Sequence, residues 1–374
     1  MKINAVTIMG MLTLLFACNS GGGAAISSSD PDIGALRLGK TAEIANASRP
    51  EIIVAPDRVF VLYLATSSPK TFNLTIYNRD MTAIISTVVL VSTDPTYGGP
   101  TDIRVVSDGT YLYAFYETCN DVQGKTYLFG VKYTLDDNFT RTAYTGAITQ
   151  STKFTVAVAG DEKTDDPAPM LGSDEVLVMT RIKSTLAQSG ETIYRFRKFN
   201  KDFLPREFSP GAMTFDLDLS AYADGEARQS SVLYAGGFYY ITVQTAVGPS
   251  SINNDDIVWS IPANILMVKL DSNFGVVDCK TVSTEAGYTD GYVTGLRTDS
   301  KYFYLTYNHV KLGTEFSSVI KIFDKSWNEV LTNKYSSVIS GALRPSIEVS
   351  TKQVFAGNID EATSKAIIYI FDKQ

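Results

Sequence analysis

The segment Met267-Val268-Lys269-Leu270-Asp271-Ser272-Asn273-Phe274 reads as a strand, a turn with an acidic residue, and an aromatic residue. The same unit recurs with Asn or Asp at residues 78, 136, 200, 271, 324 and 372. A polar turn followed by strand residues precedes each copy, as in Asp299-Ser300-Lys301-Tyr302-Phe303-Tyr304. Units of four short strands at a period of roughly 50–70 residues are typical of a radial β-propeller. We therefore expect an all-β fold, a propeller of six blades.

The two ends of the repeat array predict how the ring closes. The sixth copy, Ile368–Gln374, stops where its outermost strand would begin, and a strand-like segment over 35–44 is left without a blade. Pairing that N-terminal strand onto the last blade removes an exposed sheet edge. We expect residues 34–374 to form a single propeller domain with the N-terminal strand closing the last blade.

Composition supports strands and excludes several classes of function. The chain has 21 Tyr and 19 Phe against 2 Trp, and its formal net charge is −7. Aromatic and β-branched residues favour strands, and an acidic chain without basic clusters argues against nucleic acid as a partner. The single histidine, His309, excludes a site built on two imidazoles, and we expect no cofactor and no metal.

Residues 1–17 have the organisation of a secretory signal peptide. Lys2 precedes an apolar run, Ile3–Ala17, that is shorter than the roughly 20 residues of a bilayer span. The segment Leu15-Phe16-Ala17-Cys18 resembles the lipobox of bacterial lipoproteins, although Phe16 stands where that pattern has a small residue. The resemblance implies cleavage before Cys18 and a lipid with palmitate-type acyl chains on its thiol. An ordinary cleaved signal with an incidental cysteine is the alternative.

The resemblance also implies a location. Residues 18–33 are rich in Gly, Ala and Ser, which predicts a flexible tether between Cys18 and the domain. We expect an exported protein held at a membrane by lipid on Cys18, at the outer membrane or cell surface. As a whole the chain is similar to lipid-anchored bacterial propeller proteins as an architectural group.

Uneven loops on one face of the propeller are the main functional signal. The long connections expected there cover residues 117–125, 183–192 and 245–263. Long, variable loops on a rigid scaffold usually carry a binding site. Trp259, in the longest loop, could stack on a sugar ring or a partner, or simply cover its own loop.

Charged residues recur where the first strand of each blade enters the channel. The candidate ligand-binding residues at this mouth are Arg49, Asp102, Asp166, Arg228 and Arg344, together with Trp259. Converging arginines could grip a carboxylate or phosphate. The alternative is that they cap strand ends and pair with neighbouring acids. Acidic groups within 161–166 and 253–256 could bind calcium, or could be solvated loop residues.

Function follows less directly than fold, because no catalytic motif is recognisable and no residue is assigned a catalytic role. The repeated turn of sialidases is absent, and the segment 107–111 keeps only fragments of it. We expect a non-enzymatic, lipid-anchored protein that binds a protein or glycan partner through its long-loop face. The alternative is a glycan-acting hydrolase or lyase with an arginine-lined site at the channel mouth.

Overall fold

The computed structural model describes residues 33–136, 139–152, 162–182, 192–223, 230–246, 263–283, 285–311, 314–337, 345–360 and 363–374. Every regular element in these ranges is a strand, so the all-β prediction is confirmed there. No helix in these ranges is long and apolar enough to cross a membrane. Four of the residues singled out from the sequence, Cys18, Arg228, Trp259 and Arg344, lie outside the described residues.

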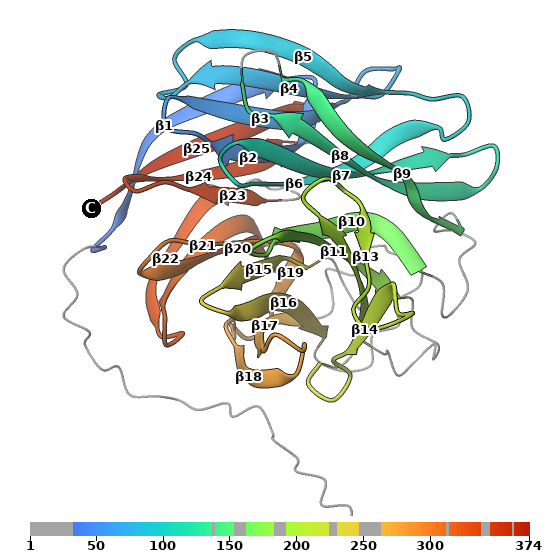
Figure 1. Ribbon diagram of the computed structural model, residues 1–374. Helices are drawn as coiled ribbons and strands as arrows, with labels where there is room; N and C mark the ends of the chain where they lie inside the picture. The colour runs from blue at the N-terminus through green and yellow to red at the C-terminus, as the bar shows by residue number, and fades with distance from the viewer. Residues whose placement is uncertain are drawn as a thin grey trace, which may run out of the picture.

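The strands form antiparallel units that follow one another along the chain (Figure 1). Unit 1 contains β2 (Ala47–Val54), β3 (Arg58–Ala65), β4 (Thr71–Asn78) and β5 (Ile84–Ser92). Unit 2 contains β6 (Gly99–Ser107), β7 (Tyr111–Asn120), β8 (Lys125–Thr134) and β9 (Arg141–Thr152). In unit 3, β10 (Glu162–Leu171), β11 (Glu175–Ile182) and β12 (Ile193–Asn200) are followed by β13 (Pro205–Arg206) and β14 (Thr214–Asp218), which both pair with β12.

The remaining strands complete three further units. Unit 4 contains β15 (Val232–Ala235), β16 (Phe238–Ala246), β17 (Ala263–Leu270) and β18 (Val276–Thr281). Unit 5 contains β19 (Thr289–Thr298), β20 (Tyr302–Lys311), β21 (Glu315–Asp324) and β22 (Glu329–Ser337). In unit 6, β23 (Ser346–Val349), β24 (Gln353–Asp360) and β25 (Lys365–Lys373) are joined by β1 (Leu36–Ala45).

Hydrogen bonding divides these strands differently from the six separate four-stranded blades predicted from the sequence. The described residues form five sheets, and only three of these sheets have four strands. Unit 3 has a fifth strand because its outer edge is split into β13 and β14. Units 4 and 5 form one eight-stranded sheet because Ala263 of β17 makes a parallel bridge with Thr289 of β19.

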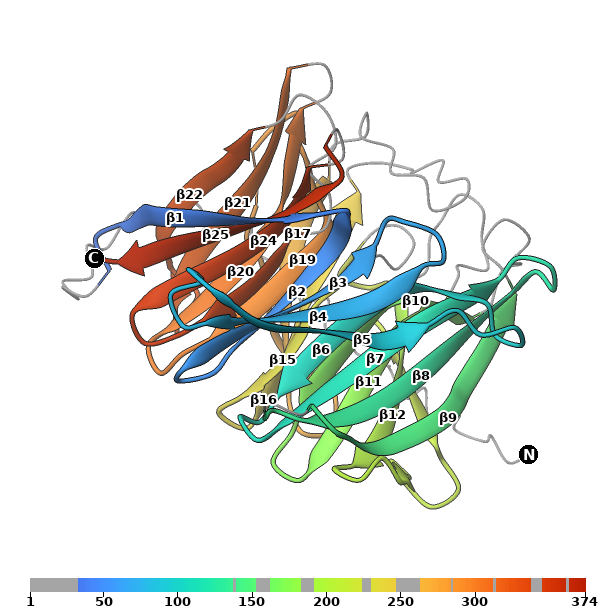
Figure 2. The ribbon, with the colours of Figure 1, turned by 90° about the horizontal axis from the view of Figure 1, so that it is seen from above.

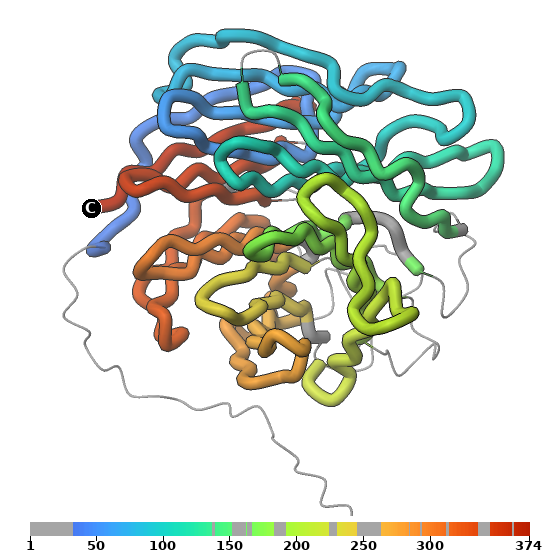
Figure 3. The backbone as a smooth tube through the Cα atoms, viewed as in Figure 1, coloured from blue at the N-terminus to red at the C-terminus, as the bar shows by residue number. Residues whose placement is uncertain are grey.

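The first strand of each unit lies at the centre of a ring. β2, β6, β10, β15, β19 and β23 each contact the next in that order, and β23 contacts β2. The chain therefore passes once around the ring, as the colour change from blue to red in Figure 3 shows. The arrangement is propeller-like. Because each antiparallel unit returns the chain to its starting end, the six inner strands all begin at the same end, which we call the mouth.

The hydrophobic core is distributed between neighbouring units rather than concentrated on the axis. Six clusters of buried residues each join one unit to the next: units 1 and 2, 2 and 3, 3 and 4, 4 and 5, 5 and 6, and 6 and 1. Strands packed on both faces bury nearly continuous apolar runs, and β3 shows one from Val59 to Ala65. This packing makes the ring a rigid scaffold for the side chains at its mouth.

The N-terminal strand closes the ring, as the sequence predicted. β1 is antiparallel to β25, in a ladder that runs from Leu36 opposite Lys373 to Ala45 opposite Lys365. Figure 2 shows the first, blue strand beside the last, red one. Lys365 Nζ and Glu43 Oε2 lie 2.6 Å apart at the mouth end of the ladder.

Candidate functional site

Irregular pairing marks the inner strands at the mouth. Four of the six inner strands have a β-bulge or register shift near their beginning: between Ser48 and Glu51, Pro100 and Asp102, Lys163 and Ala168, and Gly291 and Thr294. Bulges re-aim side chains and are frequent beside active sites. Register shifts therefore recur at the mouth, where they change the direction of side chains on four of the inner strands.

Arg49 lies in the first of these bulges, with a positive φ of 53°. Its Nη1 is 2.7 Å from Asp102 Oδ2 and also donates to the carbonyl oxygen of Thr101. Asp102 is 2 % exposed, and the Thr101 hydroxyl donates to Glu117 Oε2 at 2.6 Å. The guanidinium of Arg49 is thus engaged by a buried carboxylate of the neighbouring unit, as in the alternative weighed from the sequence.

The other candidates from the sequence lie outside this network or outside what is described. Asp166 is in β10, and its side chain is not among the described ones. The loop expected over 117–125 is mostly strand, because β7 and β8 extend to Asn120 and from Lys125. Glu162, one of the acidic residues that could bind calcium, pairs with Arg197: Glu162 Oε2 is 2.7 Å from Arg197 Nη2.

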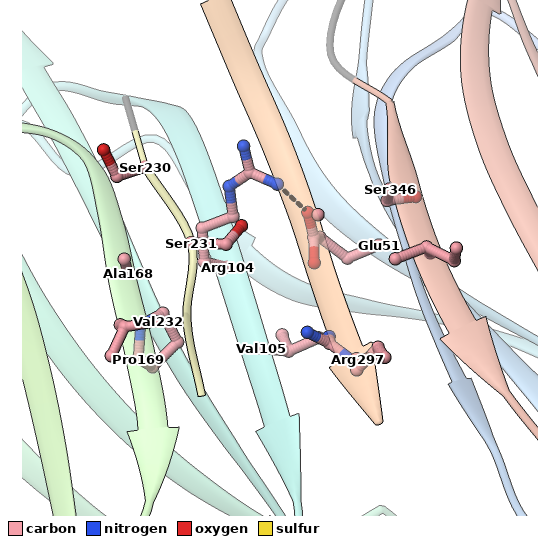
Figure 4. Close-up of a pocket in the computed structure, with 12 residues that line it drawn as sticks. Glu51, Arg104, Val105, Ala168, Pro169, Ser230, Ser231, Val232, Arg297 and Ser346 are labelled. Atoms are coloured by element: carbon pink, nitrogen blue, oxygen red, sulfur yellow. Dashed lines mark hydrogen bonds and ion pairs between the residues drawn. The ribbon is translucent and has the colours of Figure 1, made fainter. Parts of the chain in front are cut away.

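The axial channel is narrow and filled by ion pairs. All six inner strands contribute residues to its wall, and its free volume is about 30 Å³, enough for little more than one water molecule. Figure 4 shows Glu51 facing Arg104, with Glu51 Oε1 2.6 Å from Arg104 Nη1. Arg297 Nε is 2.8 Å from Glu348 Oε2. The described part of the channel has no room for a sugar ring.

Burial dominates the electrostatics of the channel. Desolvation raises the pKa of Glu51, although Arg104 and Arg297 oppose that shift by favouring the charged form. Ser346 Oγ also reaches the channel wall and has no hydrogen-bond partner among the described residues. The described part of the channel is therefore a buried polar contact between the units.

A second polar cluster surrounds the single histidine at the mouth end of unit 5. His309, near the end of β20, is opposite Asp290 of β19 in the ladder. Its Nδ1 is 2.6 Å from Asp290 Oδ1, and Glu285 Oε2 lies 3.2 Å from its Nε2. His309 is 3 % and Asp290 1 % exposed, whereas 56 % of the Glu285 side chain is exposed. We call Glu285, Tyr288, Asp290, His309 and Glu315 the His309 cluster.

Local backbone geometry creates the pairing of Asp290 with His309. The bulge between Gly291 and Thr294 shifts the register so that Asp290 comes to lie opposite the imidazole. Gly291 has a φ of 109°, and a Cβ there would lie 3.0 Å from the Gln244 side chain of β16. Only glycine adopts this conformation without strain. Gln244 Nε2 in turn donates to the Asp290 carbonyl oxygen at 2.7 Å.

Tyr288 packs against one face of the imidazole, and Glu315 in turn binds Tyr288. The Tyr288 ring stacks on His309 with centroids 3.8 Å apart and planes 8° apart. Its hydroxyl donates to Glu315 Oε2 at 2.7 Å, and this hydrogen bond raises the pKa of Tyr288 to about 12. Burial alone would raise the pKa of Glu315. Hydrogen bonds from Lys334, Tyr288 and Ser317 outweigh it and lower the pKa to about 2.

The cluster borders a cavity of about 270 Å³ between the end of unit 4 and one face of unit 5. This volume is close to the lower end of the range for small-molecule sites. Most of its wall is charged or hydroxyl-bearing: Ser283, Glu285, Asp290, Lys321, Glu329 and Thr332 are examples. Thr332 and Lys321 hydrogen-bond Glu329 and lower its pKa, against the opposite effect of burial.

Two buried polar atoms of the His309 cluster make no hydrogen bond to the described residues. Asp290 Oδ2 and His309 Nε2 are buried and make no hydrogen bond to the described residues; the carboxylate of Glu285 is near Nε2 but outside hydrogen-bond geometry. Buried polar atoms are usually hydrogen-bonded, so such exceptions in a cavity wall indicate a place for a ligand or water. The cluster can accept and relay a proton between two carboxylates through one imidazole.

No protein-family model matches the chain, and no curated protein matches it in sequence. Solved structures do share its fold. The GH93 alpha-L-arabinofuranosidase of Fusarium graminearum, in complex with arabinobiose, is 9 % identical with a TM-score of 0.59, covering 90 % of this chain and 98 % of that one. The same class of enzyme in complex with an iminosugar inhibitor is 10 % identical with a TM-score of 0.61, covering 90 % and 98 %. The phage phi92 endosialidase is 10 % identical with a TM-score of 0.56, covering 90 % and 69 %.

At these identities the likeness is one of fold. The neighbours are β-propeller glycoside hydrolases, which agrees with the propeller-like ring. They overturn the main functional expectation from the sequence, a non-enzymatic protein that binds a partner through its long-loop face.

Proposed function

We propose that this protein is a glycan-acting hydrolase whose active site is the cavity beside His309. The observation that carries the proposal is the buried Asp290–His309 pair, which opens onto that cavity with a second carboxylate, Glu285, at the far imidazole nitrogen. Acid–base chemistry needs proton carriers at the edge of a space that admits substrate. The described part of the axial channel has no space large enough for a substrate.

Hydrolysis breaks the bond from the anomeric carbon to the bridging oxygen; water gives its hydroxyl to the carbon and its proton, in net, to the oxygen. In our proposal Glu285, exposed at the cavity, gives the proton to the leaving oxygen and regains one from His309. Asp290 orients the imidazole. Glu329, kept ionised by Lys321 and Thr332 across the same cavity, accepts a proton from the attacking water and passes it to solvent, from which His309 regains the proton that it gave to Glu285.

Two further features support a carbohydrate rather than another substrate. The wall of the cavity is mostly charged or hydroxyl-bearing, which suits a ligand covered with hydroxyl groups. The fold is shared with an arabinofuranosidase and an endosialidase, which act on glycans. Fold alone does not carry function, and the His309 cluster is the feature that supports hydrolysis.

The test is release of reducing sugar from a panel of polysaccharides and chromogenic glycosides. We expect His309→Gln and Glu285→Gln to lower kcat/KM by about 10²–10⁴-fold, because each removes one proton carrier. Asp174→Asn, on the opposite face of the ring and 72 % exposed in its side chain, is the control and keeps full activity. Activity that survives both cluster substitutions, in folded protein, would place the chemistry elsewhere.

We also infer that the six units are the blades of a six-bladed propeller. The only strand pairing between the described parts of units 4 and 5 is the single bridge between Ala263 and Thr289, while the six inner strands close one ring and a hydrophobic cluster lies between each unit and the next. On this view the eight-stranded sheet is two blades that touch. Hydrogen exchange that protects units 4 and 5 independently would agree with it, and a single cooperative exchange unit would not.

The lipid anchor is a separate proposal. The run Leu15-Phe16-Ala17-Cys18 supports acylation of Cys18, export, and anchoring at the outer membrane or cell surface, with the glycan as the partner reached from there. In a bacterial host, incorporation of labelled palmitate into the protein, abolished by Cys18→Ser, is the expected result. Incorporation that persists in Cys18→Ser would exclude Cys18 as the acylated residue.

A further inference from the structure

We infer that the cavity beside His309 takes an uncharged glycan and rejects sugars that carry a carboxylate, such as uronic and sialic acids. The inference rests on the proposed function, whose site it describes more closely. It follows from the charges around the cavity and the channel, where described cations are paired with protein carboxylates and two carboxylates are not paired with a lysine or an arginine.

The two cations that line the cavity are already neutralised. Lys321 Nζ lies 3.0 Å from Glu329 Oε2 and also donates to the carbonyl oxygen of Val282. Lys334 Nζ lies 2.9 Å from Glu315 Oε1. A substrate carboxylate would have to displace a protein carboxylate from either lysine before it could bind there.

Three of the described arginines at the mouth and channel are neutralised in the same way. Each of these three pairs with an acid of another unit: Arg49 with Asp102, Arg104 with Glu51 and Arg297 with Glu348 (Figure 4 shows the second pair). Asp102 and Glu51 are almost completely buried, which strengthens their attraction to Arg49 and Arg104. An anionic sugar would therefore have to compete with a protein carboxylate for each of these three arginines.

Two carboxylates of the cavity wall are not neutralised by a lysine or an arginine in the described residues. Asp290 Oδ2 has no hydrogen-bond partner among the described residues, and more than half of the Glu285 side chain is exposed. A protonated His309 would offset only one of these two carboxylates. Two like charges at 4 Å repel by about 1 kcal/mol in water and about 4 kcal/mol near a protein surface. Sugar hydroxyls, in contrast, can donate to both carboxylates.

The test compares neutral and acidic glycans in two independent readouts. Hydrolysis is measured as kcat/KM on arabinan, other neutral polysaccharides, polygalacturonate and polysialic acid. Binding of matched oligosaccharides is measured by calorimetry on His309→Gln. We expect kcat/KM and affinity to be at least about tenfold lower for the acidic set, since the repulsion corresponds to one or more factors of ten.

The two proposals fail in different ways. Binding of neutral oligosaccharides without hydrolysis of any glycan would overturn the proposed function and leave the charge preference standing. Acidic glycans bound or cleaved as well as neutral ones would overturn the charge preference. Failure of both sets to bind would overturn both proposals, because the cavity would then not be a glycan site.

A variant that frees Lys334 from its carboxylate partner tests the charge preference directly. Glu315→Gln removes the carboxylate that neutralises Lys334, so the ratio of acidic to neutral binding should rise about tenfold or more. Glu348→Gln is the matched control, because it releases Arg297 into an axial channel too narrow for a sugar, and the ratio should not change. A ratio that stays constant in Glu315→Gln, in folded protein, would contradict the charge argument.

Discussion

Asp299 shows how a single carboxylate can hold two units together. In the turn before β20 its Oδ1 accepts the backbone N–H groups of Lys301 and Tyr302, and its Oδ2 accepts the Tyr304 hydroxyl at 2.6 Å and Lys373 Nζ of unit 6 at 2.9 Å. Burial opposes ionisation, but these hydrogen bonds outweigh it and lower the pKa of Asp299 to about 2. Asp108 repeats the arrangement in unit 2, with Tyr113 and Lys201.

A carboxylate whose pKa is lowered by folding stabilises the folded state above its ordinary pKa, and that contribution is lost as pH falls through the folded value. Asp299→Asn should therefore lower the free energy of unfolding by about 1–2 kcal/mol at pH 7, after allowing for partial solvent exposure. The difference from the natural protein should shrink between about pH 4 and pH 2. Denaturant unfolding at several pH values measures it; a difference that stays constant with pH would refute the linkage.

His309 illustrates what residue patterns alone could not predict. Near the turn of the β19–β20 hairpin, Thr298 pairs with Phe303, and an unbroken register would place Tyr292 opposite the histidine. The bulge shifts the strands by two residues and brings Asp290 there instead. The sequence identified the histidine but gave it no partner, since a bulge has no clear signature beyond Gly291. The pairing of Arg49 with Asp102, in contrast, was one of the two alternatives that the sequence left open.

The turn between the third and fourth strands is the element that the sequence predicted best. In units 1 to 5 an Asn or Asp begins the turn and an apolar residue three positions later is buried with positive φ: Met81, Phe139, Phe203, Phe274 and Trp327. In unit 4, Asp271 Oδ1 accepts the N–H groups of Asn273 and Gly275, which fixes the tight bend. The pattern visible in the sequence is thus a turn that inserts one side chain between neighbouring units.

Glycine would adopt the positive φ of these positions more easily, but only a large side chain provides the packing between units. Positive φ costs a non-glycine residue about 1–3 kcal/mol. Phe274 is 7 % exposed, and its ring stacks on Tyr239 with centroids 4.7 Å apart and on Phe215 with centroids 4.9 Å apart. Burial of a side chain of this size stabilises by more than the strain costs.

We therefore expect Phe274→Ala to lower the free energy of unfolding by about 3–5 kcal/mol, which thermal or denaturant unfolding measures. Ile84→Ala in the outer strand β5, where the side chain is 62 % exposed, is the matched control and should change it by less than about 0.5 kcal/mol. Equal effects of the two substitutions would show that the inserted side chain does not join units 3 and 4.

For the whole molecule, the sequence predicted the ring and its closure because both depend on repeated patterns that need no exact register. It did not predict the joining of units 4 and 5, which depends on one bridge between Ala263 and Thr289. Nor did it predict the cavity, which exists only where Ser283 of one unit meets the charged face of the next. Periodicity determines the architecture, while sites depend on the exceptions to it.

Closure by β1 can be tested by removing it. A protein that begins at Ala47 loses the ladder to β25 and the packing of Ile44, so we expect a lower unfolding midpoint and self-association through the exposed β25 edge. Gly34 N donates to Gln374 O at 2.6 Å, so a circular permutant that carries residues 33–45 after Gln374 should regain the natural midpoint. Equal midpoints for the truncated and natural proteins would show that β1 is dispensable.

The distance along the chain between Glu43 and Lys365, 322 residues, also sets an order of events during biosynthesis. At about 5–20 residues per second, a ribosome needs roughly 15–65 s to make the intervening chain. During that time β1 is a strand without its partner, and the ring cannot close whatever else has formed. The earliest of the described strands along the chain is thus the last to find its partner, because β1 must wait until β25 has been made.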